Sequence, residues 1–161
     1  MKLLNILKEI IEGKQVGTLY HLTTLRGLHG ILNDGFIKPN SEGQISTTRN
    51  KDIDPSSFLD TYDSGGEITA ILELDGDKIS NNYKVRPFYY DEDTLPNDRD
   101  PAYISKYEFE EQIITNGKNF PIFPYLRNVS ITIDSEDNLD EEKLAQVESL
   151  LKDKNIPYEI K

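Results

Sequence analysis

Apolar side chains recur at helical spacing directly after a short apolar run near the start of the chain. The run covers residues 18–22 and predicts a buried strand. The following segment is predicted to be a helix that begins after Thr23 or Thr24 and ends at Gly35. Its apolar face consists of Leu25, Leu28, Ile31 and Leu32. We therefore expect His21 at the carboxyl end of a strand, beside a helix N-terminus.

The same patterns predict the remaining elements of an α+β chain. Amphipathic spacing indicates a helix at residues 2–12 and another at residues 139–152, capped by Asn138 or Asp140. A short strand is expected at Gln44-Ile45, and longer strands at 67–75, 83–90, 103–115, 128–134 and 156–160. Pro87 favours an edge position for the strand at 83–90. Loops are expected at 49–66, 91–101 and 121–124, and a turn at Asp75-Gly76-Asp77.

Composition narrows the classes of protein that remain. The 161 residues carry a formal charge of -11, which disfavours broad binding to a nucleic-acid backbone and is compatible with a basic protein partner. The absence of cysteine excludes disulfides and thiolate catalysis, and with only two histidines we expect no metal site. No apolar stretch predicts a membrane span or a cleaved leader, so we expect one domain without membrane contact, located in the cytoplasm.

Polar residues cluster after two of the predicted strands. His21 and Thr23 end the first strand, where a helix N-terminus would present free amides and positive dipole to phosphate or ribose oxygens. Ser46, Thr48 and Arg49 follow the second, short strand and add hydroxyls and a cation. This arrangement is typical of a nucleotide site. Taken alone, however, His21 is compatible with a histidine bonded to backbone, and Arg49 with a surface ion pair.

Carboxylates interrupt the apolar strand predicted at residues 103–115. Strand alternation places Glu108 and Glu110 on one face and Glu111 on the other. Because a buried, unpaired carboxylate is costly, at least one of them is expected to face a site or a cation. The alternative is a solvated outer face.

Taken together, these motifs resemble the ADP-ribosyltransferase superfold. The matching stretches are Tyr20-His21-Leu22-Thr23, Ile31-Leu32 before Gly35, the run from Ile45 to Asn50, and Glu110-Glu111-Gln112-Ile113. The chain looks most like small bacterial and phage-encoded members, and more distantly like DNA-modifying ADP-ribosyltransferase toxins. The resemblance implies a split β-sheet core over residues 17–134, flanked by an N-terminal helix in residues 1–16 and a C-terminal helix and strand in residues 135–161.

The resemblance also implies NAD as the substrate and a role for each polar residue. His21 would bind the hydroxyls of the nicotinamide ribose, assisted by Thr23. Ser46 and Thr48 would line the nicotinamide side. Arg49 would reach the pyrophosphate or stabilise the departing group.

The catalytic carboxylate implied by the resemblance is Glu111 or Glu110. Glu111 is selected if the motif aligns on the following Ile113, and Glu110 if it is the second acid of a pair with Glu108. Glu111 is preferred. A carboxylate near the ribose would stabilise the positive charge that develops as the nicotinamide–ribose bond breaks.

Three functions are compatible with these motifs. The first is transfer of ADP-ribose from NAD to a protein or nucleic-acid acceptor, as in a phage or toxin effector. The second, transfer of a 2-phosphate from RNA to NAD, uses several basic residues, and few lie near these motifs. The third is a catalytically silent domain that binds a nucleotide or, through its acidic surface, a protein. The position of the carboxylates of residues 108–111 relative to His21 discriminates between enzyme and binding domain.

Overall fold

The computed structural model describes residues 16–52, 70–87, 110–133 and 139–161. The helix expected at 2–12 and the acidic loop expected at 91–101 lie outside this part of the chain. So do most of the loop expected at 49–66 and the first residues of the strands expected at 67–75 and 103–115.

The described residues form a mixed α+β structure, as the sequence predicts. The helices are α2 (Leu25–Asp34), α4 (Gly76–Ser80) and α6 (Glu141–Asp153). The strands are β1 (Thr18–Thr23), β2 (Phe36–Ile37), β3 (Gln44–Thr48), β4 (Ala70–Asp75), β5 (Lys84–Pro87), β6 (Glu110–Ile114), β7 (Phe120–Pro121), β8 (Leu126–Ile131) and β9 (Tyr158–Ile160).

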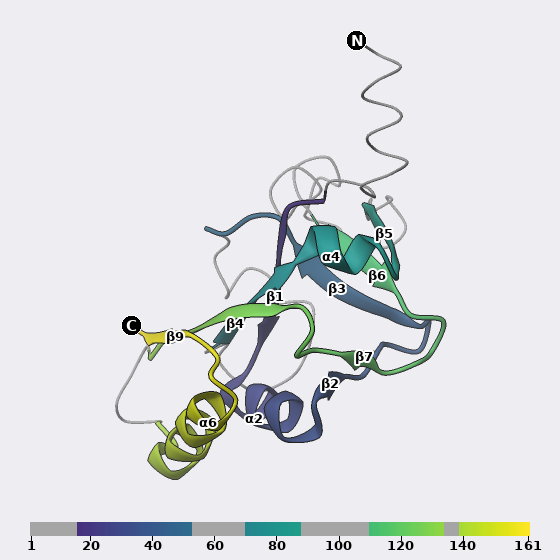
Figure 1. Ribbon diagram of the computed structural model, residues 1–161. Helices are drawn as coiled ribbons and strands as arrows, with labels where there is room; N and C mark the ends of the chain where they lie inside the picture. The colour runs from purple at the N-terminus through teal and green to yellow at the C-terminus, as the bar shows by residue number, and fades with distance from the viewer. Residues whose placement is uncertain (1–15, 53–69, 88–109, 134–138) are drawn as a thin grey trace, which may run out of the picture.

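Strand β1 lies at the centre of a seven-stranded sheet with the order β5-β6-β3-β1-β4-β8-β9. Neighbouring strands pair antiparallel, except β8 and β9, which pair parallel. Strands β2 and β7 form a separate two-stranded sheet. Helices α2 and α6 lie side by side next to the large sheet (Figure 1). This order places β3 between β1 and β6, a strand that is distant from both in sequence.

The caps of α2 follow the predicted signals. Of the two candidate threonines, Thr24 is the N-cap, and its hydroxyl accepts a hydrogen bond from Gly27 N at 3.0 Å. Gly35 ends the helix with φ 81° and donates its N–H to the carbonyl of Ile31. Glycine suits this left-handed conformation because it has no Cβ. The helix therefore starts directly after β1 and fixes the carboxyl end of that strand.

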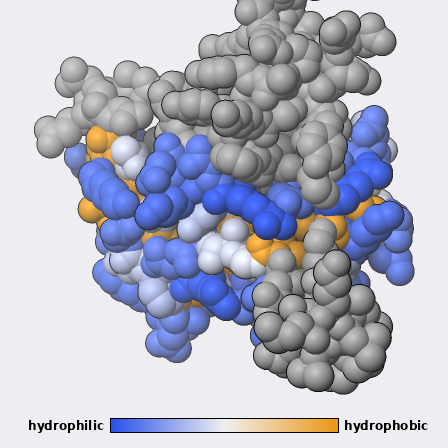
Figure 2. Space-filling view, turned by 90° about the horizontal axis from the view of Figure 1, so that it is seen from above, coloured by the Kyte–Doolittle hydropathy of each residue, from blue (hydrophilic) through white to orange (hydrophobic). Residues whose placement is uncertain are grey.

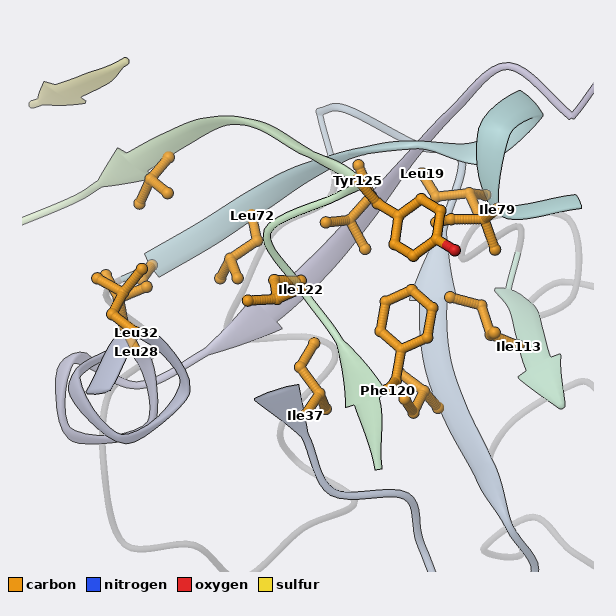
Figure 3. Close-up of a cluster of buried hydrophobic side chains, with 14 of the residues drawn as sticks. Leu19, Leu28, Leu32, Ile37, Leu72, Ile79, Ile113, Phe120, Ile122 and Tyr125 are labelled. Carbon is orange, nitrogen blue, oxygen red and sulfur yellow. The ribbon is translucent and has the colours of Figure 1, made fainter. Parts of the chain in front are cut away.

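One core joins both sheets and the helices. Leu28 and Leu32 of α2 are fully buried, and Phe120 stacks on Tyr125 with ring centroids 5.2 Å apart (Figure 3). Val147 and Leu151 of α6 are also fully buried and continue this core. Burial of these apolar side chains is the main driving force for the arrangement. The C-terminal helix is thus part of the same core as the central sheet.

Several predicted boundaries need correction. The turn expected at Asp75-Gly76-Asp77 is the start of α4, in which the side chain of Asp75 accepts from Lys78 N. A glycine is needed at 76 because a Cβ there would lie 2.3 Å from the carbonyl oxygen of Gly17.

The bounds of other predicted elements also differ from the structure. Strand β7 occupies the first residue of the loop expected at 121–124. The strand expected from 128 begins at Leu126, the one expected from 156 begins at Tyr158, and α6 takes Asp140 as its cap. The edge position predicted for the strand with Pro87 is confirmed.

The described residues present a mainly polar surface on the face seen from above. There, apolar residues show in separate patches among the hydrophilic ones (Figure 2). Phe123 and Ile160 are the large apolar residues that are exposed within the described ranges. None of the described helices is long and apolar enough to cross a membrane.

Candidate functional site

A row of polar side chains crosses the strands β1, β3 and β6. Thr47 of β3 stands directly opposite Glu111 of β6, so both side chains lie on the same face of the sheet. Tyr20 stands opposite Thr48, and alternation along the strands therefore places His21 on the face of Thr47 and Glu111. The structure thus brings His21 and Glu111 to one face of the sheet, on strands separated by β3, as the enzyme hypothesis requires.

The preceding row on the same face is apolar. Leu19, Ile45 and Ile113 lie two residues before His21, two before Thr47 and two after Glu111, and all are buried. The face therefore changes from hydrophobic core to polar site within one step of each strand. Because of this boundary, the core packing holds the three strands in place, and the side chains of the polar row extend from strands that are already fixed.

Glu111 is a buried carboxylate with the guanidinium of Arg49 beside it. Its Oε1 lies 2.7 Å from Nε of Arg49, and the exposed fractions of the two side chains are 6% and 39%. Its Oε2 is buried and has no hydrogen-bond partner among the described residues. This confirms that one acid of the 108–111 group faces a cation. An unpartnered buried carboxylate oxygen is costly to leave in place, which is typical of a functional site.

His21 is held by the backbone of the neighbouring strand. Its Nδ1 lies 2.9 Å from the carbonyl oxygen of Ser46. A carbonyl only accepts, so Nδ1 carries the proton, and Nε2 of the neutral ring is left as an acceptor. Burial lowers the pKa of His21 below its usual 6.5, and the hydrogen bond to Ser46 opposes this shift. The site therefore favours the neutral ring.

Thr23 ends β1 beside the first turn of α2. A Cβ added to Gly27 would lie 2.1 Å from Oγ1 of Thr23, which shows how closely the hydroxyl approaches the helix. Alternation places Thr23 on the same face as His21. The predicted proximity of Thr23, His21 and a helix N-terminus is thus present.

Ser46 and Thr48 take a different position from the other predicted residues. Alternation puts both side chains on the face opposite Thr47 and Glu111. The hydroxyl of Thr48 accepts from Asn50 N at 3.0 Å, and Ser46 reaches His21 through its carbonyl. The structure therefore does not bring these hydroxyls together with the carboxylate. Glu110 stands opposite Thr48 in the ladder, and its side chain, like Glu108, lies outside the described part.

Sequence reasoning missed Thr47. Its hydroxyl donates to the main-chain carbonyl of Glu111 at 2.7 Å, and both residues are buried. The signal was present in the alternation of β3, because Thr47 follows Ile45 on the core face while its neighbours point away. A single cluster of hydroxyls, as expected for this segment, does not distinguish Thr47 from Ser46 and Thr48, which lie on the other face of β3.

The described residues contain no group of three or more His, Cys, Asp or Glu side chains placed to hold a metal ion. The row itself offers a carboxylate, an imidazole, hydroxyls and, beside Glu111, a guanidinium. These groups suit hydrogen bonding to a polyhydroxylated ligand and stabilisation of positive charge.

Comparison with known proteins supplies an independent view of the fold. No family model matches the chain, and no curated protein matches it in sequence. Among solved structures, Thermus sp. 2.9 DarT in complex with NAD+ matches with a TM-score of 0.55 at 12% identity. The match covers 92% of this chain and 96% of that one, so the likeness extends beyond residues 17–134. The chain therefore has an α+β fold similar to that of this DarT structure, and the fold expected from its motifs is confirmed.

Proposed function

We propose that the protein is an NAD-dependent ADP-ribosyltransferase that transfers ADP-ribose to a protein or nucleic-acid acceptor. The observation that carries this proposal is the buried Glu111, whose Oε1 is paired with Arg49 and whose Oε2 has no partner among the described residues. It lies in the same row as His21 on a fold shared with a structure that contains NAD+. NAD is thus the proposed substrate.

In the proposed reaction the bond between the ribose carbon and the nicotinamide nitrogen breaks, and the same carbon bonds to the acceptor, which loses a proton. The ribose acquires oxocarbenium character as nicotinamide leaves. Oε2 of Glu111 accepts a hydrogen bond from a ribose hydroxyl and stabilises this charge. A carboxylate already fixed by Arg49 needs little reorganisation to do so.

His21 orients the ribose in this proposal. Because Nδ1 is occupied by the carbonyl of Ser46, Nε2 accepts from a second ribose hydroxyl. Thr23 assists at the end of β1, beside the N-terminus of α2. Ser46 takes part in the proposal through its main-chain carbonyl, which holds His21, whereas its side chain and Thr48 lie on the opposite face of β3, away from the proposed NAD site.

Arg49 has a double role in this proposal. Its Nε holds Glu111, while its partly exposed guanidinium presents the terminal nitrogens to an anion. These nitrogens bind the pyrophosphate or stabilise the departing group. Before NAD binds, the positive charge of Arg49 lies beside the carboxylate of Glu111.

The test is nicotinamide release and NAD binding by the wild type, Glu111→Gln, Glu110→Gln and His21→Asn. Glu111→Gln keeps the shape and removes the charge, so we expect turnover to fall about a hundredfold or more while NAD still binds. Glu110→Gln is the neighbouring control and should retain turnover. If Glu110→Gln abolishes release and Glu111→Gln does not, the catalytic carboxylate is Glu110.

A second candidate is a catalytically silent domain that binds a nucleotide or a basic protein. The closed ion pair of Arg49 and Glu111 favours it, since the same pair also stabilises a protein that performs no chemistry. Binding of NAD without nicotinamide release in any variant would support it. A label transferred from NAD to a host protein or nucleic acid would instead support the transferase and a phage- or toxin-type effector in the cytoplasm.

A further inference from the structure

We propose that Thr47 is a positioning residue that fixes Glu111 for catalysis. The inference rests on the proposed function, because it concerns the carboxylate of that reaction. Thr47 touches neither NAD nor the acceptor in this proposal. It acts through the main chain of Glu111.

The strand pairing defines the contact. Thr115 N donates to Gly43 O at 2.9 Å, and hydrogen-bonded pairs recur at every second residue of an antiparallel ladder. Thr47 and Glu111 therefore form a hydrogen-bonded pair, and the Glu111 carbonyl faces β3. The hydroxyl of Thr47 adds a second donor to this carbonyl, at 2.7 Å.

The main chain of Glu111 bonds to β3 and not to β5. The N–H and C=O of one residue in an antiparallel ladder point to the same side, so Glu111 and Pro87, the last residue of β5, form a non-hydrogen-bonded pair. The described ladder between β5 and β6 ends at this pair. The bonds from β3, including that of the Thr47 hydroxyl, thus hold the main chain from which the Glu111 side chain extends.

This support matters because the Glu111 side chain makes a single described polar contact, with Arg49. A shift of its main chain moves Oε1 away from Arg49 Nε and turns Oε2 out of the row that contains His21. Thr47 is 1% exposed and Glu111 5%, so water does not replace a lost bond there. Removing the Thr47 hydroxyl should therefore impair turnover more than NAD binding.

The chain contains a matched control on the same ladder. The hydroxyl of Thr115 donates to the carbonyl of Gly43 at 3.1 Å, and Thr115 is buried. This contact has the same chemistry as that of Thr47 but lies at the far end of β6. Thr115→Val therefore reports the loss of such a bond without disturbing Glu111.

The experiment compares kcat and KM for NAD in wild type, Thr47→Val, Thr47→Ser and Thr115→Val. Thr47→Val retains the shape and removes the hydroxyl, and we expect its kcat to fall about tenfold to a hundredfold with KM little changed. Thr47→Ser should recover most of the turnover. Thr115→Val should lower the stability of the protein about as much as Thr47→Val does, because each variant loses one buried hydroxyl bond. Its kcat should stay near that of the wild type.

A second readout does not depend on turnover. The Arg49 Nε–H resonance reports the 2.7 Å contact with Glu111. It should shift in Thr47→Val and stay in place in Thr47→Ser and Thr115→Val. Equal kcat values for Thr47→Val and Thr115→Val, or an unchanged resonance in Thr47→Val, overturn the positioning role. An inactive wild type rejects the proposed function, while the resonance still decides whether Thr47 positions Glu111.

Discussion

Arg49 Nε lies 2.7 Å from Oε1 of Glu111, and this contact joins the end of β3 to the start of β6. The carboxylate is buried, whereas the guanidinium is more than one third exposed, so solvent weakens the pair without replacing it. The contact thus both supports the sheet and prepares the carboxylate for chemistry.

Removing the cation should destabilise the protein more than removing both partners. We expect Arg49→Met to lower the free energy of unfolding by about 1–3 kcal/mol, because Glu111 keeps a buried charge without a partner. The double variant Arg49→Met/Glu111→Gln should recover part of this loss. Urea unfolding of the single and double variants measures both values. Strictly additive effects would contradict the pairing.

Stability should fall on acidification because of His21. Burial lowers the pKa of its ring in the folded state below the usual 6.5, so below that pH the unfolded chain binds a proton that the folded protein does not. The contribution of neutral His21 is therefore present above about pH 6.5 and is lost as pH falls toward the folded pKa. Unfolding free energies of wild type and His21→Asn between about pH 7.5 and about pH 5.5 test this. His29→Asn is the control. If the unfolding free energy of His21→Asn falls with pH as steeply as that of the wild type, the prediction is wrong.

Two glycines of α2 should respond differently to alanine. At Gly30 a Cβ would meet nothing within 4 Å, and we expect Gly30→Ala to stabilise the protein by up to about 1 kcal/mol through helix propensity. At Gly27 the Cβ would lie 2.1 Å from Thr23 Oγ1, so the threonine must rotate and the gain should vanish. Thermal unfolding compares the two variants. If Gly27→Ala stabilises as much as Gly30→Ala, Thr23 is not confined by the helix.

Phe120 should be among the most sensitive core positions. It is fully buried, stacks on Tyr125 and meets Tyr83 edge-on at 5.1 Å. We expect Phe120→Ala to lower the free energy of unfolding by about 3–5 kcal/mol, because it leaves a cavity as well as removing apolar contact. Chemical denaturation measures the loss. Phe123→Ala serves as the exposed control and should change stability far less.

Local signals in the sequence determined the elements with the strongest periodicity. Helix α2 could be predicted with both ends, because Thr24 and Gly35 act on neighbouring backbone groups and need no distant contact. Pro87 likewise predicted an edge strand, since a missing N–H constrains pairing wherever the strand lies. The polar residues that follow the first two predicted strands, from His21 to Thr23 and from Ser46 to Arg49, also indicated a nucleotide site. Each of these inferences rests on chemistry within a few residues.

The shortest elements and the exact ends of several longer ones could not be predicted from the sequence. The two-residue strands β2 and β7 have no measurable period, and their pairing brings Phe36 to Pro121 across the chain. The segment after Asp75 carries turn residues yet continues as α4, because Ile79 gains burial in the core. Tertiary packing outweighed local preference at both places.

The site itself was decided by long-range strand pairing. Sequence alone placed His21, Ser46 and Thr48 near strand ends and the glutamates within a strand, but only the register of β3 on β6 selects which side chains share a face. That register separates Ser46 and Thr48 from Glu111 and brings in Thr47. Because a shift of one residue would move every side chain to the other face, no local pattern fixes the choice. The sequence therefore determined the chemical groups, and the tertiary structure determined which of them meet.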